Sequence, residues 1–353
     1  MHSVRSKLFV FATFLALHAA AVAGDAYKWS VQYLIDNSQG VFGRSMKVFP
    51  RNNRGLAISP DGKFLYAGYN HSFDGVGEVR RIAIDIADYE RAVTTIVAGP
   101  LGKAITVDDK GRVYIAAQNE VLVYDSHLEK RIFRINAGDC EGVCAVREGA
   151  VLVLYASDRT LGLLQRFVLT EKDGMCTEAK LGGFDGTGSF HIPGIDDARG
   201  VEVDAKGNIW VADLKGGKVF RIRKDAKDVK SVEVKTPIDI AFDKDRVFVT
   251  RWTDAAISVL DGDMNVLGNL NVPWEELELS PRGNNGNGAL SGIVTVPGKG
   301  FFVANEAGQT GGQRSIYGKA DDDAEIIDGK LYRDIFADDN DPILRATEVS
   351  ATQ

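Results

Sequence analysis

The 353-residue sequence has few of the residues on which common enzyme classes depend. It contains five histidines and three cysteines, Cys140, Cys144 and Cys176, and lacks the paired Cys/His spacing of a zinc site. An odd cysteine count leaves at least one thiol without an intrachain disulfide partner. The sequence also has no Gly-x-Ser-x-Gly nucleophile elbow and no glycine-rich phosphate loop that opens a helix. We therefore do not expect a serine hydrolase or a nucleotide-binding enzyme of the usual kinds.

Long apolar runs are also scarce, because only Leu8 to Ala23 forms one. The run follows Arg5 and Lys7 and ends in Ala21-Val22-Ala23, the small-x-small pattern that signal peptidase recognises. We predict that residues 1–23 are a signal peptide cleaved after Ala23 and that the protein is secreted or periplasmic. The alternative is an uncleaved anchor, although the run is shorter than the roughly 20 residues that a spanning helix needs. No later stretch predicts a stable membrane span.

The charge balance also excludes some partners. Without Arg5 and Lys7, 40 basic residues remain against 49 acidic ones, a net charge of −9. No basic patch is interleaved with aromatic residues. We therefore expect no nucleic-acid partner and no attraction to anionic lipid, and we predict a monomer.

A recurring strand-turn-strand unit organises the rest of the chain. Its first copy is RGLAISPDGKFLYAGYN, from Arg54 to Asn70, and equivalent positions recur at spacings of 49, 38, 58, 39 and 53 residues. Periods near 40 to 50 residues with short apolar strands are typical of propeller blades. We predict an all-β, six-bladed β-propeller of four-stranded antiparallel blades over residues 24–340, followed by a polar C-terminal tail, 341–353. The N-terminal strand, Val31 to Ile35, should close the ring by pairing with the last blade.

The unit from Arg199 to Asp213, RGVEVDAKGNIWVAD, resembles NHL-type repeats and the related gluconolactonase and regucalcin propellers. The SPDGKFLY segment of the first copy is also similar to YVTN-type repeats. The resemblance covers nearly the whole chain after the signal peptide. It implies the fold, whereas the activity does not follow from it.

In the resembling propellers, first strands begin and second strands end on one face. Carried onto this sequence, that rule gives a first-strand group of Arg54, Lys103, Glu141, Arg199, Asp239 and Ser291. It gives a second-strand group of Asn70, His71, Asn119, Asp158, Asp213, Arg251, Trp252, Asn305 and Glu306. We expect these residues to meet at the mouth of the central channel and to include the ligand-binding site.

The chemistry of these residues leaves several functions open. Arg54 and Arg199 offer forked donors for a carboxylate or sulfate, and Tyr69 and Trp252 offer aromatic faces. We predict that the mouth binds a small anionic, carbohydrate-like or peptide ligand. The structural alternative is that the charged residues Arg54, Glu141, Arg199 and Asp239 pair only with one another. A protein-interaction platform is a further alternative.

The resemblance also implies an enzymatic alternative, a metal-dependent lactonase, hydrolase or lyase at the same mouth. Such an enzyme would hold a divalent cation such as calcium through oxygen ligands. The candidate metal ligands are Glu141, Asp213, Asp239 and Asn305. The chain lacks the glutamate-glycine-proline opening motif of the gluconolactonase type, and three cations of the first-strand group disfavour a metal beside them. No residue is assigned a catalytic role.

Overall fold

The computed structural model describes residues 27–33, 53–70, 77–86, 89–99, 102–254, 256–273, 276, 290–305, 324–327, 330–333 and 343–348. The predicted signal peptide lies outside the described residues, as do two predicted site residues, His71 and Glu306. Among the described residues, no helix has the length and apolar character needed to cross a membrane.

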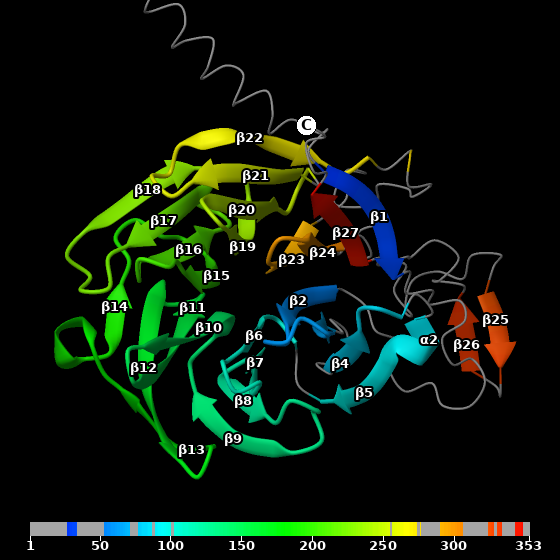
Figure 1. The fold of residues 1–353 in the computed structure, drawn as a ribbon, viewed down its shortest axis with the longest axis horizontal. Coiled ribbons are helices and arrows are strands. Elements are labelled where there is room, and N and C mark those ends of the chain that lie inside the picture. The colour runs from blue at the N-terminus through cyan, green and yellow to red at the C-terminus, as the bar shows by residue number, and fades with distance from the viewer. Residues whose placement is uncertain are drawn as a thin grey trace, which may run out of the picture.

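Six antiparallel sheets form a ring, five with four strands and one with four blade strands and a short fifth strand, which confirms the predicted six-bladed β-propeller (Figure 1). Blade 1 consists of β2 (Asn53–Ile58), β3 (Phe64–Asn70), β4 (Gly77–Ala83) and β5 (Val93–Ala98), with the short helix α2 (Tyr89–Ala92) before β5. Blade 2 consists of β6 (Ile105–Val107), β7 (Val113–Ala117), β8 (Glu120–Tyr124) and β9 (Arg131–Asn136). Blade 3 consists of β10 (Cys140–Glu148), β11 (Val151–Asp158), β12 (Leu163–Lys172) and β13 (Met175–Leu181).

The second half of the ring follows the same plan. Blade 4 consists of β15 (Ala198–Val203), β16 (Ile209–Asp213), β17 (Lys218–Ile222) and β18 (Val229–Glu233). Blade 5 consists of β19 (Pro237–Asp243), β20 (Arg246–Arg251), β21 (Ala256–Asp261) and β22 (Val266–Asn271). Blade 6 has the order β23 (Leu290–Val296), β24 (Gly300–Asn305), β27 (Ile343–Glu348) and β1 (Tyr27–Tyr33). The predicted closure is thus confirmed, because the N-terminal strand β1 forms the outer edge of the last blade. The strand begins at Tyr27, four residues before the expected Val31, and the last two residues of the expected range, 34 and 35, lie outside the described part.

The C-terminal segment corrects the sequence-based boundary. Residues 341–353 were expected to be a polar tail, but Ile343–Glu348 forms β27, between β24 and β1. Ile343, Leu344 and Ala346 are fully buried there. The burial of these three residues outweighs the polarity of their neighbours, so the propeller extends past residue 340.

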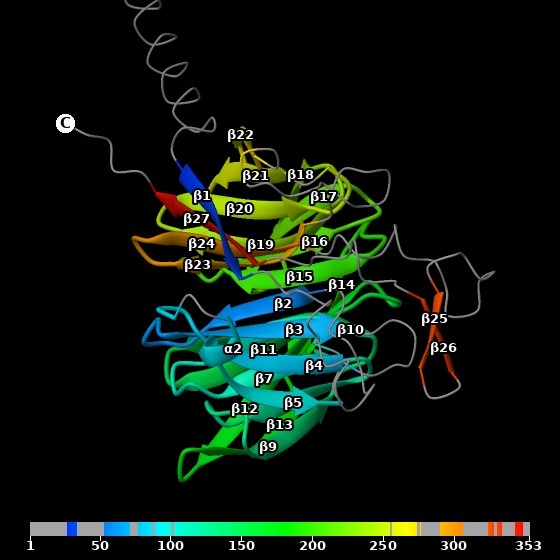
Figure 2. The same ribbon diagram turned by 90° about the vertical axis from the view of Figure 1, so that its right-hand side faces the viewer.

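Two insertions extend the regular blades. The glycine-rich segment between blades 3 and 4 contains a 3₁₀ turn, η1 (Phe184–Gly186), and a short strand, β14 (Ser189–His191), which pairs with β12. Between β24 and β27 the chain forms a separate hairpin of β25 (Ala324–Ile327) and β26 (Lys330–Arg333), which lies beside the ring (Figure 2).

The hydrophobic core is divided among the blade interfaces. The buried apolar residues form six clusters, each between two neighbouring blades around the ring. Because both faces of a blade are covered, second strands such as IWVAD in β16 are buried along their whole length. This packing explains why the second strands are continuous apolar runs in the sequence.

Aspartates close several of the turns between first and second strands. Asp204 accepts hydrogen bonds from the backbone N–H groups of Lys206 and Asn208, at 2.9 and 2.8 Å, and from Trp210 Nε1 at 3.0 Å. Asp108 plays the same role in blade 2. The recurring Asp and Tyr/Trp positions of the repeat therefore stabilise the turn and lie at the end of the first strand away from the predicted mouth.

Candidate functional site

The first strands of the six blades surround the axis and approach one another closely. A Cβ atom added to Gly55 would lie 2.9 Å from Ala104 Cα, and one added to Gly200 would lie 2.5 Å from Asp239 Oδ1. Real Cβ atoms do not come this close to their neighbours, so these positions need glycine. The equivalent positions around the ring are Gly55, Ala104, Gly142, Gly200, Asp239 and Gly292. Asp239 is the one ionisable residue among the six.

The predicted first-strand group is brought together at this ring. A small cavity of about 20 Å³ is lined by Arg54, Lys103, Ala104, Glu141, Arg199, Gly200, Ile238, Asp239, Ser291 and Gly292. All six members of the first-strand group are in this lining. The volume holds about one water molecule. A ligand larger than a water molecule therefore does not fit inside this small cavity.

Glu141 is the centre of a buried ion-pair cluster. Its carboxylate contacts Lys103 Nζ at 2.6 Å, Arg199 Nη1 at 2.8 Å and Arg54 Nη1 at 3.6 Å, and its side chain is only 3% exposed. Burial by itself raises the pKa of Glu141, but the charges of Arg54, Arg199 and Lys103 outweigh burial and hold the pKa below its usual value. The structural alternative, in which Arg54, Glu141, Arg199 and Asp239 pair with one another, fits the contacts of Glu141 with the two arginines. It does not fit Asp239, whose Oδ2 accepts a hydrogen bond from Ile293 N at 3.0 Å.

Three further residues join this cluster, and sequence reasoning did not select them. Arg159 contacts Asp139 Oδ2 at 3.0 Å and Glu141 Oε1 at 3.5 Å. Asp197, which is buried, accepts a hydrogen bond from Arg199 Nη2 at 3.1 Å. Their positions in the sequence could have indicated that they lie at the mouth. Asp139 and Asp197 immediately precede first strands, and Arg159 immediately follows a second strand. We call the seven residues the mouth cluster: Arg54, Lys103, Asp139, Glu141, Arg159, Asp197 and Arg199.

Asp213 and Asp158, two members of the second-strand group, are used by the backbone. The Asp213 carboxylate accepts hydrogen bonds from the N–H groups of Asp197 at 2.8 Å, Gly216 at 3.0 Å and Asp196 at 3.2 Å. Asp158 accepts one from Leu161 N at 3.0 Å. Both carboxylates therefore hold loops that follow the second strands and contact no cation of the mouth cluster in the described structure.

Of Arg251, Tyr69 and Trp252, only Trp252 lies beside the mouth cluster. Arg251 pairs with Asp254 and donates to Asn269 Oδ1 at 3.1 Å, so it faces the outer strand β22. Tyr69 is fully buried within a core cluster, contrary to the expectation that it offers a face to a ligand. Trp252 is partly buried, and its ring centroid lies 5.7 Å from the Arg54 guanidinium. Trp252 is thus the aromatic residue beside the mouth cluster.

The asparagines of the second-strand group occupy three environments. Asn119 is exposed in the turn between β7 and β8. Asn305, at the end of β24, is buried, and its Oδ1 has no hydrogen-bond partner within the described structure. Asn70 ends β3, and its side chain is outside the described part.

The candidate metal ligands do not offer free oxygen atoms at one point. The Glu141 oxygens contact cations, and the Asp213 oxygens accept backbone hydrogen bonds. Asp239 Oδ2 accepts a hydrogen bond from Ile293 N at 3.0 Å. The described residues contain no group of three His, Cys, Asp or Glu side chains arranged to hold a metal ion. Glu141 and Asp213 therefore already use their oxygen atoms for other partners, and either would have to give up a contact to bind a divalent cation.

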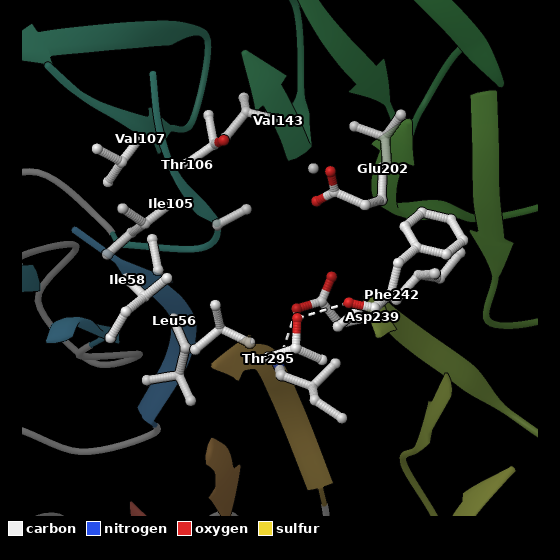
Figure 3. Close-up of a pocket in the computed structure, with 18 of the residues that line it drawn as sticks. Leu56, Ile58, Ile105, Thr106, Val107, Val143, Glu202, Asp239, Phe242 and Thr295 are labelled. Carbon is white, nitrogen blue, oxygen red and sulfur yellow. Dashed lines mark hydrogen bonds between the residues drawn. The ribbon is translucent and has the colours of Figure 1, made fainter. Parts of the chain in front are cut away.

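A larger cavity of about 310 Å³ continues along the channel from the glycine ring (Figure 3). It is lined by residues of all six first strands, and two carboxyl groups, Glu202 of β15 and Asp239 of β19, face into it. Burial raises the pKa of both groups to about 7, and the charge of Glu202 adds to the shift of Asp239. Sequence reasoning missed Glu202. A signal was present, because among the six blades only blade 4 has a carboxyl side chain two residues after its ring position.

No protein-family model and no curated protein sequence matches the chain. Solved structures match it in fold. A streptogramin B lyase has a TM-score of 0.50 at 10% identity, with 80% of this chain and 81% of that chain covered. A virginiamycin B lyase from Staphylococcus aureus has a TM-score of 0.50 at 11% identity, with 92% and 100% covered. The WD40 repeats of RRP9 have a TM-score of 0.51 at 9% identity, with 75% and 77% covered. At these identities the likeness shows the propeller fold alone.

Proposed function

We propose that the protein binds a small ligand carrying a carboxylate or sulfate at the mouth of its channel. The observation that carries this proposal is Arg159, which is 42% exposed at the rim while its Nε contacts Asp139 at 3.0 Å. The guanidinium is therefore held in place and still open to solvent. An anchored guanidinium binds a carboxylate through two parallel hydrogen bonds and loses little conformational freedom when it does so.

The surroundings of Arg159 support an anionic and partly apolar ligand. Lys103, 10% exposed, adds positive charge beneath the rim, and Trp252 offers an aromatic surface nearby. A ligand with a carboxylate and a ring, such as a uronic acid, matches both features. We also propose that the repeats are of the NHL type and that the chain is exported. Both proposals rest on the sequence patterns.

Isothermal titration calorimetry with glucuronate and with neutral glucose tests the proposal. We expect glucuronate to bind more tightly than glucose, and Arg159→Gln to weaken glucuronate binding at least about tenfold, because one charge-assisted hydrogen bond contributes about 1.5–3 kcal/mol. Arg134→Gln is the matched control, since Arg134 is 66% exposed on the outer strand β9 and contacts Glu120 at 3.6 Å. The control should bind like the wild type.

Several results would reject the proposal. One is a wild-type protein that binds neither glucuronate nor sulfate. Another is an Arg159→Gln variant with unchanged affinity. Loss of binding with EDTA and recovery with calcium would instead favour the metal-dependent lactonase or lyase alternative.

A further inference from the structure

We infer that the channel cavity, as distinct from the mouth, binds a small organic ammonium ion. The ammonium group would lie between Glu202 and Asp239, and its hydrocarbon part would contact the aliphatic wall. This inference does not rest on the function proposed for the mouth.

The cavity has two chemically different walls (Figure 3). Glu202 and Asp239 come from neighbouring blades and form the acidic wall. The other wall is aliphatic and comes from blades 1, 2 and 3, with Leu56, Ile58, Ile105, Val107 and Val143. A ligand that satisfies both walls has to carry a positive charge at one end and an apolar body at the other.

The two carboxyl groups lack a cationic partner within the described structure. Glu202 Oε1 accepts hydrogen bonds from the Cys144 thiol at 3.1 Å and from Val203 N at 3.3 Å. Asp239 Oδ2 accepts one from Ile293 N at 3.0 Å. The cavity lining contains no Lys, Arg or His. The remaining charge of the two groups is therefore available to a cation that enters the cavity.

An ammonium ion suits this cavity better than a metal ion. Calcium takes six to eight oxygen ligands, and two carboxyl groups beside an aliphatic wall supply too few. An ammonium group has three N–H donors. The lining offers three groups that can accept them, the carboxyl groups of Glu202 and Asp239 and the hydroxyl of Thr106. An alkyl group would also bury apolar surface against the aliphatic wall, which favours binding. A metal ion would make no such contact.

The cavity is accessible from one end. Towards the mouth it is limited by the glycine ring and the mouth cluster, where the adjoining cavity measures only about 20 Å³. At the other end Val107, Val203 and Thr295 are partly exposed. A ligand would therefore enter from the face opposite the mouth.

Calorimetric titration with cyclohexylammonium tests the inference, with cyclohexanol as the neutral probe of the same shape. We expect one cyclohexylammonium per chain and at least about tenfold weaker binding of cyclohexanol. Glu202→Gln and Asp239→Asn should each weaken cyclohexylammonium binding at least about tenfold. Glu178→Gln is the matched control, because Glu178 is 47% exposed on β13 and should leave affinity unchanged. Thermal unfolding of each variant establishes that it is folded before it is titrated.

The pH dependence has a defined sign. The ammonium stays charged below pH 9, whereas burial raises the pKa of Glu202 and of Asp239 to about 7. The Cys144 thiol contacts Glu202, and it stays neutral because burial raises its pKa. Asp239 also lines the small cavity at the mouth, together with the charged residues Arg54, Lys103, Glu141 and Arg199. Affinity should rise about tenfold between pH 6 and pH 8 for each carboxyl group that must lose its proton.

The inference is overturned if folded wild-type protein fails to bind cyclohexylammonium, or if cyclohexanol binds equally well. It is also overturned if Glu202→Gln binds like the wild type, if affinity does not rise with pH, or if calcium displaces the ammonium probe at equal concentration.

Discussion

Replacement of Glu141 by glutamine tests the electrostatic description of the mouth most directly. The substitution keeps the shape of the side chain and removes the negative charge that Lys103, Arg199 and Arg54 contact at 2.6, 2.8 and 3.6 Å. These cations would remain in a site where their side chains are only 10 to 13% exposed. Removing one member of a buried ion pair costs about 3–5 kcal/mol, so we expect a loss of that size in the free energy of unfolding.

Urea denaturation followed by tryptophan fluorescence and circular dichroism measures this loss. Glu178→Gln is the control of identical chemistry, because Glu178 pairs with Lys180 at 2.9 Å on the surface, where the two side chains are 47% and 71% exposed. Exposed pairs contribute about 0–1 kcal/mol, so the control should unfold close to the wild type. Equal unfolding midpoints for the two variants would refute the description of Glu141 as the centre of the cluster.

The same comparison has a pH dependence. The folded pKa of Glu141 lies below its unfolded value, so its ionisation stabilises the native state above the unfolded pKa of about 4.3. This contribution is lost as the pH falls through the folded pKa. The stability difference between wild type and Glu141→Gln should therefore be constant from pH 7 to pH 5 and shrink below about pH 4. A difference that grows in acid would contradict the assigned direction.

Two further predictions concern the fold and the processing of the chain. Gly55→Ala should destabilise the protein by about 1–3 kcal/mol in urea, because its Cβ would lie 2.9 Å from Ala104 Cα, whereas Gly262→Ala, with open space around it, should stay within about 1 kcal/mol of the wild type. N-terminal sequencing of protein recovered from the exporting host should begin at Gly24, and a chain that retains Met1 would contradict cleavage after Ala23.

The sequence by itself determined the repeat and hence the architecture. The strand-turn-strand copies have a local apolar pattern that is readable without knowledge of their neighbours, so the six blades and the closing strand β1 were predictable. Rotational repetition also places equivalent residues at equivalent heights. The convergence of Arg54, Lys103, Glu141 and Arg199 around one small cavity followed from that geometry.

The tertiary structure alone decided how each charged residue is used. Asp213 and Glu141 both lie at strand ends in the predicted mouth, yet Asp213 holds backbone N–H groups while Glu141 holds cations. Glu202 lies at an ordinary strand position and becomes a channel residue only because six inner strands enclose a space there. The partner of a polar side chain depends on distances of a few ångströms between blades far apart in the chain, and local sequence patterns contain no information on such distances.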